Sequence, residues 1–274
     1  MPNGYEVKET ILSARNVSVT YGDKPILKDL NLQVKNITRP GVEQGQVIGL
    51  LGPSGVGKTT LFRCLAGLMK PDTGEVFVTE KMVPVERGMV GVVAQHYPLF
   101  SHRTVLGNLA VAGRQAGLSG DEATRKATDL LKRFGIEEQS SHYPVQLSGG
   151  QRQRVAIAQQ FMCSDHFLLM DEPFSGLDLI AIQRVSDFIC EIAQTDELKT
   201  IIIVTHDIDA ALAVCDTVWL LGRDHDAAGK PIPGARIQQI CDLAERGLAW
   251  RKNHQNTPEF LATLGEVREA FTKL

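Results

Sequence analysis

The sequence contains few residues that could form covalent or metal cross-links. Its five cysteines are scattered and include no C-x-x-C pair, so the chain has neither a zinc-ribbon pattern nor a disulfide framework. The seven histidines are equally dispersed. The cysteines fall at Cys64, Cys163, Cys190, Cys215 and Cys241. We expect all five to be reduced residues that contribute to packing.

Long apolar runs and an excess of basic charge are also missing. Stretches such as 201–204 and 219–221 are far shorter than the roughly 20 residues that cross a bilayer, and the N-terminus lacks a signal-peptide pattern. The 29 Lys and Arg residues against 32 Asp and Glu give a net charge of -3, which argues against a nucleic-acid partner. With 274 residues and 43% hydrophobic content, we expect one large globular domain in the cytosol.

A glycine-rich loop is the most informative feature that is present. It follows the apolar segment 47–51 and fits the pattern G-x-x-x-x-G-K-[ST]. In this pattern backbone N–H groups surround the phosphates of a nucleotide, Lys58 reaches the terminal phosphates and the Thr59 hydroxyl binds Mg²⁺. The predicted nucleotide-binding residues are Gly52, Pro53, Ser54, Gly55, Val56, Gly57, Lys58, Thr59 and Thr60. A chance glycine loop is the alternative, and the preceding strand and following amphipathic run argue against it.

Strand-like and helix-like segments alternate around this loop. Helical periodicity fills 104–141, where Ser119 and Glu122 suit a capping box and Gly135 can end a helix. We expect a helical segment inserted into an α/β domain. Strands are predicted around Val17–Val19, Leu30–Val34, Val47–Leu51, Glu75–Val78, Met89–Val93, Phe167–Met170, Thr200–Val204 and Val218–Leu221.

A second loop of the same chemical character stands at Leu147-Ser148-Gly149-Gly150-Gln151, before a helix-like run. With the first loop, this LSGGQ sequence makes residues 12–221 resemble the nucleotide-binding subunit of ABC transporters. The resemblance implies a P-loop NTPase α/β core with a parallel sheet, an N-terminal antiparallel β subdomain and an inserted helical subdomain. It further implies a head-to-tail dimer, in which Ser148, Gly149, Gly150 and Gln151 of one subunit complete the ATP site of the other. As an isolated pentapeptide, LSGGQ is more often a helix cap.

Further residues match the motif order of this family. The apolar strand 167–170 runs into Asp171 and Glu172, at the edge of a parallel sheet where ligands bind. The resemblance makes Asp171 a Mg²⁺ ligand and Glu172 the general base for the attacking water. It gives Gln95 contact with Mg²⁺ and the attacking water, and His206 contact with the γ-phosphate.

Two further binding residues are predicted only from their position in the motif order. Tyr21 matches the aromatic residue that stacks on adenine, although a tyrosine at a hairpin end also packs without a ligand. Asp178, in Ser175-Gly176-Leu177-Asp178, matches the loop that aligns the two subunits, and taken alone it is an ordinary turn and helix cap.

Several segments depart from the family pattern. Residues 35–44 and 222–234 predict enlarged surface loops, and Ala158-Gln159-Gln160 stands where the family often has an arginine. The tail is too short for an extra β-domain, and its apolar residues recur on one helical face. We expect it to pack on its own subunit, although contact with the second subunit is an alternative. The domain division is therefore 1–95 and 165–240 for the core, 96–164 for the helical subdomain and 241–274 for the tail.

The resemblance predicts an ATPase subunit of a transporter, at the cytoplasmic face of the membrane, that uses ATP and Mg²⁺. Expected partners are a second copy, permease subunits docking at Gln95–Phe100, and a solute-binding protein as a further candidate. An importer is the first interpretation; an exporter or lipid-trafficking complex and a soluble non-transport ABC ATPase are the alternatives. The run 242–248 is similar to nitrate, sulfonate or taurine importers, and the Gln95 region to amino-acid importers, so the substrate stays open.

Overall fold

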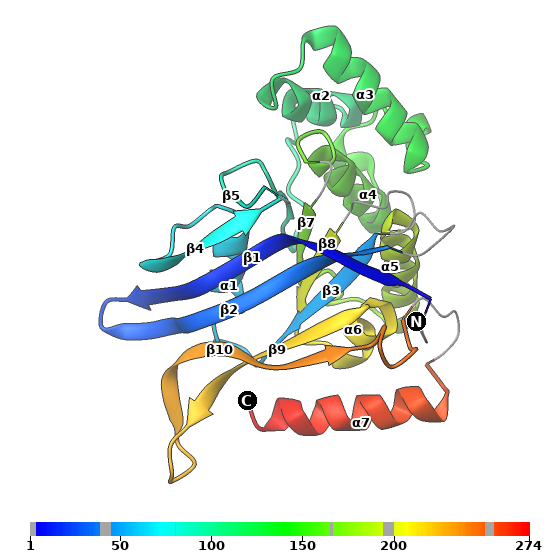
Figure 1. The fold of residues 1–274 in the computed structure, drawn as a ribbon. Helices are drawn as coiled ribbons and strands as arrows, with labels where there is room; N and C mark the ends of the chain where they lie inside the picture. The colour runs from blue at the N-terminus through cyan, green and yellow to red at the C-terminus, as the bar shows by residue number, and fades with distance from the viewer. Residues whose placement is uncertain (1–3, 39–44, 80, 165–166, 194–199, 250–254) are drawn as a thin grey trace.

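The computed structural model describes residues 4–38, 45–79, 81–164, 167–193, 200–249 and 255–274. Its described strands form one mixed sheet in the order β5-β4-β1-β2-β10-β9-β3-β8-β7-β6 (Figure 1). The strands are β1 (Glu6–Tyr21), β2 (Lys24–Thr38), β3 (Gln46–Leu51), β4 (Thr73–Val78), β5 (Val83–Pro84), β6 (Gly91–Val93), β7 (Phe167–Asp171), β8 (Thr200–Thr205), β9 (Thr217–His225) and β10 (Pro231–Asp242). The predicted α/β class with a P-loop core is confirmed.

The parallel half of the sheet holds the predicted apolar strands. β3 pairs in parallel with β8 and β9, and β7 pairs in parallel with β6 and β8. Every residue of β3 and β8 is buried. A strand that is covered on both faces of the sheet needs apolar side chains on both faces. This explains why these segments are continuous apolar runs in the sequence.

The N-terminal half is antiparallel, as predicted. β1 and β2 form a long hairpin closed by Gly22, whose φ of 59° suits glycine, and β4 pairs with the other edge of β1. Alternate residues such as Val17 and Val19 are buried, which matches the period of two seen in the sequence.

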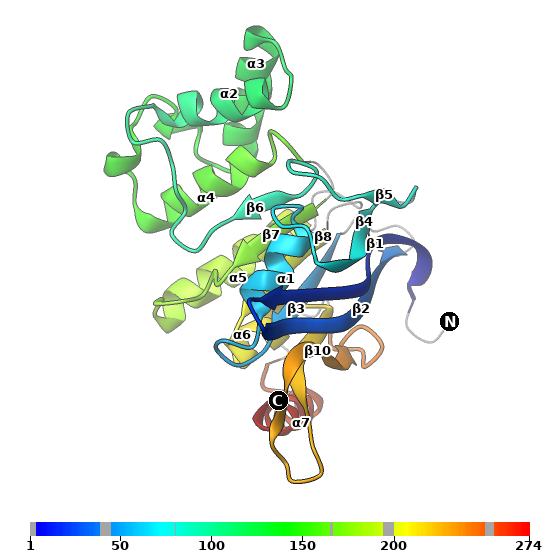
Figure 2. The ribbon, with the colours of Figure 1, turned by 90° about the vertical axis from the view of Figure 1, so that its left-hand side faces the viewer.

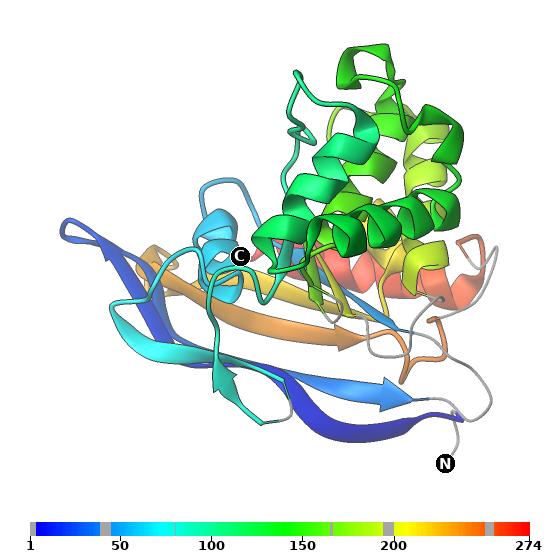
Figure 3. The ribbon, with the colours of Figure 1, turned by 90° about the horizontal axis from the view of Figure 1, so that it is seen from above.

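Helices cover both faces of the sheet (Figures 1 and 3). The helix α1 (Lys58–Leu65) packs with the antiparallel strands in one apolar cluster that includes Leu50 and Trp219. A second apolar cluster on the opposite face contains α5 (Leu179–Ala193), α6 (Ile208–Val214) and α7 (Pro258–Thr272). The two loops that follow β3 and β7 therefore open at one sheet edge between these layers.

The predicted helical segment projects from the edge of the sheet near β6 (Figure 2). Its helices are α2 (Val105–Gln115), α3 (Gly120–Arg133) and α4 (Gly149–Gln160), with short 3-10 turns η1 (Glu137–Gln139) and η2 (Pro144–Gln146). The predicted capping box is present, because Ser119 and Glu122 cap each other's backbone N–H groups. Gly135 follows α3 with a φ of 63°, as a helix-terminating glycine should.

One of the two predicted surface loops is wrong. Residues 222–234 continue β9 as far as His225 and begin β10 at Pro231, so they form a projecting hairpin with a turn at 226–230 (Figure 2). The segment was predicted as a loop because Gly222, Gly229 and Gly234 are of a residue type that is common in loops. At 35–44, residues 35–38 belong to β2, and the remaining six lie outside the described residues.

The tail packs on its own chain, as expected. Phe260, Leu264 and Val267 of α7 are buried in the same cluster as α6, and Phe271 packs against its margin. Arg268 of α7 also donates to both carboxylate oxygens of Asp209 on α6 at 2.8 Å.

The cysteine prediction holds only in part. Cys64, Cys215 and Cys241 are buried and Cys190 is half-buried, but Cys163, which follows the end of α4, is exposed. Within the described ranges, no helix combines the length and apolar composition that a membrane span requires.

Candidate nucleotide-binding and catalytic site

The loop between β3 and α1 adopts a conformation that depends on its glycines. Gly55 and Gly57 have φ values of 74° and 123°, a region that other residues rarely adopt. A Cβ on Gly52 would lie 2.6 Å from the carbonyl oxygen of Leu221, so the loop also needs glycine to approach β9. The sequence GPSGVGKT therefore specifies this loop geometrically as well as chemically.

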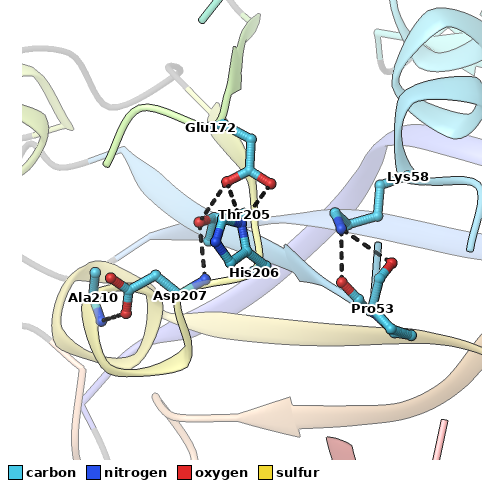
Figure 4. A network of polar contacts seen from close by, with 8 residues as sticks. Pro53, Lys58, Glu172, Thr205, His206, Asp207 and Ala210 are labelled. Atoms are coloured by element: carbon cyan, nitrogen blue, oxygen red, sulfur yellow. Dashed lines mark hydrogen bonds and ion pairs between the residues drawn. The ribbon is translucent and has the colours of Figure 1, made fainter. Parts of the chain in front are cut away.

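Lys58 occupies the centre of this loop. Its Nζ donates to the carbonyl oxygens of Gly52 at 2.7 Å and Pro53 at 3.3 Å (Figure 4). Burial lowers the pKa of Lys58, and the charges of Glu172 and Asp171 partly oppose that shift. A buried ammonium held only by carbonyl groups has capacity to bind an anion.

A cavity of about 400 Å³ lies beside Lys58 and gathers most of the predicted site. It draws residues from the end of β1, the glycine loop, the loop after β6 and the end of β7. The lining residues are Tyr21, Ile26, Ser54, Gly55, Gly57, Lys58, Thr59, Thr60, Gln95, Asp171 and Glu172. Residues far apart in the sequence thus form one polar pocket, as the motif order predicts.

The two acids at the end of β7 have different environments. Asp171 is the last residue of the strand, and burial together with the Glu172 charge raises its pKa, although Lys58 and Arg63 oppose the shift. Glu172 has a φ of 48°, and its N–H donates to the carbonyl oxygen of Val204 at 2.8 Å. This left-handed turn directs consecutive carboxylates to different places, Asp171 toward Lys58 and Glu172 toward the end of β8.

Glu172 is held by the last residue of β8 and by the residue after it (Figure 4). The Thr205 hydroxyl donates to Glu172 Oε2 at 3.1 Å, and His206 Nδ1 lies 3.0 Å from both Glu172 oxygens. Asp207 caps α6 by accepting from the N–H of Ala210. The structure therefore fixes the predicted general base from one side and leaves its other side open to the pocket.

Tyr21 stands at the outer end of the pocket. It is half exposed, and its hydroxyl lies 3.5 Å from the Thr60 Oγ1. An exposed ring beside a phosphate-binding loop is a suitable stacking surface for a purine. Ile26 also lines the pocket and was not predicted, because an isoleucine in a strand carries no sequence signal of its own.

Gln95 lines the pocket from the loop after β6, and the residues that follow it vary in exposure. Tyr97 donates its hydroxyl to the carbonyl oxygen of Pro173, and burial raises its pKa to about 12. Leu99 packs against the apolar cluster that contains α5, α6 and α7, whereas Phe100 is 43% exposed. Only part of this apolar stretch is therefore available to a partner.

The LSGGQ residues lie outside the pocket. Ser148 and Gln151 cap the start of α4 reciprocally, at 2.9 Å and 3.3 Å, and Gly149 and Gly150 are exposed with open space beside them. Asp178 caps α5 by accepting from the N–H of Ala181. Within one chain these residues stabilise helix ends and do not contact the predicted nucleotide site.

The pocket suits a hard divalent cation bound with a polyphosphate. Thr59, Gln95 and Asp171 offer hydroxyl, amide and carboxylate oxygens, which are the ligand types that Mg²⁺ prefers. The part of the chain that the structure describes contains no group of three or more His, Cys, Asp or Glu side chains able to hold a metal by itself. Phosphate oxygens would complete this ligand set, and the positive charge of the cation would favour the ionised form of Asp171.

Comparison with known proteins matches this arrangement. The family model described as ABC transporter matches residues 35–175, just over half of the chain. The chain belongs to the ABC transporter family. The cucumber sulfate/thiosulfate import ATP-binding protein cysA is 39% identical to this ABC protein over 266 residues, which cover 94% of the chain and 69% of the relative.

Two further relatives add detail. The Fe(3+) ions import ATP-binding protein FbpC of Agrobacterium fabrum is 40% identical over 218 residues, covering 78% of this ABC protein and 59% of the relative. The chain thus spans about three fifths of that relative's length. The solved structure of cbiO1 from Clostridium perfringens, part of the ABC transporter complex cbiONQ, matches with a TM-score of 0.72 and 27% identity. That match covers 96% of this chain and all of the solved one.

Several residues that organise the site carry no motif. Thr205 orients Glu172, and its place immediately before His206 could have indicated this role. Asn108 is fully buried and holds the loop after Gln95 through its contacts with the backbone of Phe100 and Thr104. Gln160 belongs to the run 158–160, where the family often has an arginine, and it accepts from the N–H of Val92, which ties α4 to β6. Their roles depend on distant backbone groups, which local sequence does not reveal.

Proposed function

We propose that this chain is the ATP-hydrolysing subunit of an ABC importer. The observation that carries the proposal is the single pocket that joins Tyr21, the glycine loop, Asp171, Glu172 and Gln95. Import subunits among the relatives support the direction of transport. The expected division is a core at 1–95 and 165–240, a helical subdomain at 96–164 and a tail at 241–274, acting at the cytoplasmic face of the membrane as a peripheral subunit.

The proposed chemistry follows from the positions of the side chains. Lys58 and the loop N–H groups would bind the phosphates, and Tyr21 would stack on adenine. Mg²⁺, held by Thr59, Asp171 and Gln95, would neutralise phosphate charge. Glu172 would accept a proton from the attacking water, while His206 and Thr205 keep its carboxylate in place.

We further propose that two copies complete each ATP site. Ser148, Gly149, Gly150 and Gln151 are accessible at the start of α4 but lie outside the pocket of their own chain. A second copy, placed head to tail, would bring these donors and Asp178 to the nucleotide. Dimer closure on two MgATP would then precede hydrolysis.

Hydrolysis and dimerisation of the purified chain test this proposal together. We expect wild type to hydrolyse MgATP, and Glu172→Gln to lose about 100-fold or more of the turnover while forming a stable dimer with ATP in light scattering. Glu191→Gln, on the exposed surface of α5, is the matched control and should behave as wild type. Absence of nucleotide binding in wild type would refute the function, and a monomeric Glu172→Gln with bound ATP would refute the dimer.

A permease subunit is the proposed partner at Gln95–Phe100. Phe100 is the better residue to test, because Leu99 packs against the core and Leu99→Asp would disturb folding. We expect Phe100→Asp to abolish transport by the assembled complex while the isolated subunit keeps its ATPase activity. Retained transport would contradict docking at this stretch.

The proposed solute is an oxyanion. The run 242–248 suggested nitrate, sulfonate or taurine importers, and one relative is named for sulfate and thiosulfate; all of these solutes carry an oxyanion group. A solute-binding protein would deliver it to the permease. Uptake of labelled sulfate, nitrate and Fe³⁺ by cells with and without the chain would test the class, and Fe³⁺ uptake alone would contradict it.

A further inference from the structure

Arg223 of β9 lies directly beside the phosphate-binding loop. β9 runs parallel to β3 with Leu220 opposite Leu51, so the residues that follow the two strands remain neighbours. Two residues beyond Leu221, the Arg223 guanidinium Nη2 donates to the carbonyl oxygen of Gly55 at 3.1 Å. The elongated hairpin that the sequence did not predict therefore supplies a cation to the P-loop.

This hydrogen bond acts on one peptide unit of the loop. The Gly55 carbonyl accepts from Arg223, and the N–H of the same peptide, on Val56, donates toward the Pro53 carbonyl at 3.3 Å. The C=O and N–H of a trans peptide point in opposite directions, so holding the carbonyl outward directs the N–H inward. A charged donor on the carbonyl also strengthens the N–H as a donor.

Neighbouring residues keep Arg223 available for this contact. The adjacent carboxylate, Asp224, is engaged by Arg236 at 2.9 Å and by Gln238 at 3.1 Å. The backbone N–H of Arg223 donates to the Leu274 carbonyl oxygen at 3.4 Å. The Leu274 side chain covers Gly222, where a Cβ would lie 2.6 Å from Leu274 Cδ2. β9 is thus supported on both sides at the point where Arg223 leaves it.

We infer that Arg223 is a positioning residue for polyphosphate binding, which rests on the proposed nucleotide function. It holds the Gly55–Val56 peptide with its N–H directed into the loop and places a positive charge against the backbone of the phosphate-binding loop. Its contribution is to the affinity for the phosphates and not to the hydrolytic step, because its contact is with the loop backbone and Glu172 is held by other residues.

The test compares Arg223→Ala and Arg223→Lys with Lys230→Ala, which removes an exposed cation from the turn of the same hairpin. Calorimetry measures MgADP binding, and steady-state kinetics give KM and kcat for ATP. We expect Arg223→Ala to weaken MgADP binding and raise KM by about 3- to 10-fold, with kcat within about twofold of wild type. Inorganic pyrophosphate should compete with MgADP less well in Arg223→Ala, and its affinity should fall by the same factor, because Arg223 does not act on the adenine.

The controls separate positioning from folding. Arg223→Lys should recover most of the affinity, Lys230→Ala should keep wild-type affinity, and the melting temperatures of the nucleotide-free variants should match. Unchanged MgADP affinity in Arg223→Ala, an equal loss in Lys230→Ala, or a loss that Arg223→Lys does not restore would each overturn the inference. If wild type itself bound no MgADP, the proposed function would fail first.

Discussion

His206 Nδ1 lies 3.0 Å from both carboxylate oxygens of Glu172, so the imidazole contacts the whole carboxylate and not one oxygen of it. The Thr205 hydroxyl adds a third contact at 3.1 Å. Both partners come from the end of β8, the strand next to β7. Adjacent parallel strands thereby deliver the predicted base and the groups that orient it to one point.

Replacing His206 by Ala should reduce turnover far more than nucleotide affinity. The carboxylate of Glu172 would lose its bidentate contact, and we expect kcat to fall by about 10- to 100-fold while the Kd for MgADP changes by less than about threefold. Single-turnover hydrolysis and calorimetry measure the two quantities. His225→Ala, an exposed histidine of the hairpin, should leave both unchanged. An equal loss of affinity and turnover would contradict an orienting role.

Asp171→Asn should raise the stability of the nucleotide-free protein at neutral pH. Burial and the Glu172 charge raise the pKa of Asp171 in the folded state, so the folded state binds more protons than the unfolded state between the ordinary value of 3.8 and the raised one. The free energy of unfolding then falls as the pH rises through that window, and the full loss is present above it. Asparagine removes this penalty.

Thermal unfolding at two pH values measures the effect. We expect Asp171→Asn to melt roughly 1–3 °C above wild type near pH 7.5 and to approach it near pH 4. Exposed Asp187→Asn is the control. An equal difference at both pH values would show that the gain does not come from ionisation of Asp171.

Asn108→Leu should destabilise the attachment of the helical segment. Asn108 is fully buried; it accepts from the N–H of Phe100 at 2.7 Å and donates to the carbonyl oxygens of Phe100 and Thr104. Leucine would leave the Phe100 N–H without this acceptor, while the two carbonyl oxygens would keep their bonds from the backbone N–H groups of residues 103 and 108. We expect a loss of about 1–3 kcal/mol in the free energy of unfolding. Urea titration measures this loss, with exposed Gln115→Leu on the same helix as the control. Equal midpoints for the two variants would contradict the anchoring role.

Cys163 should be the first thiol to react in the native protein. It is exposed, whereas Cys64 and Cys190 are more buried and burial raises the pKa of each to about 11. Mass spectrometry after brief alkylation near pH 8 should find one modified residue, and none after the change Cys163→Ser. Early modification of Cys190 would contradict this order.

The sequence predicted the residues of the pocket better than it predicted the hairpin and the contacts that surround the pocket. Lys58, Asp171 and Glu172 follow apolar strands at fixed motif positions, and parallel pairing brings strand ends together whatever the surrounding sequence. The motif order therefore located the pocket residues without any knowledge of distances.

Other features depend on contacts that no local pattern encodes. The hairpin at 222–234 resembles a loop in the sequence because it contains several glycines. At Gly234 the cause is close packing, since a Cβ there would lie 2.6 Å from the Lys28 Cβ of β2. Asn108 and Arg223 act through carbonyl and N–H groups, which are the same in every residue type. Their partners can be recognised only once the chain has folded.

The hydrogen bond from Val92 to Gln160 has a consequence for solubility. β6 is three residues long and forms one margin of the sheet that the described strands build, where an outward N–H could recruit a strand from another molecule. Gln160 Oε1 occupies the Val92 N–H at 3.1 Å, and the opposite margin, β5, is only two residues long. β5 is thus too short to pair with a strand of another molecule, and β6 is short and partly covered by Gln160. This protects the sheet against edge-to-edge aggregation.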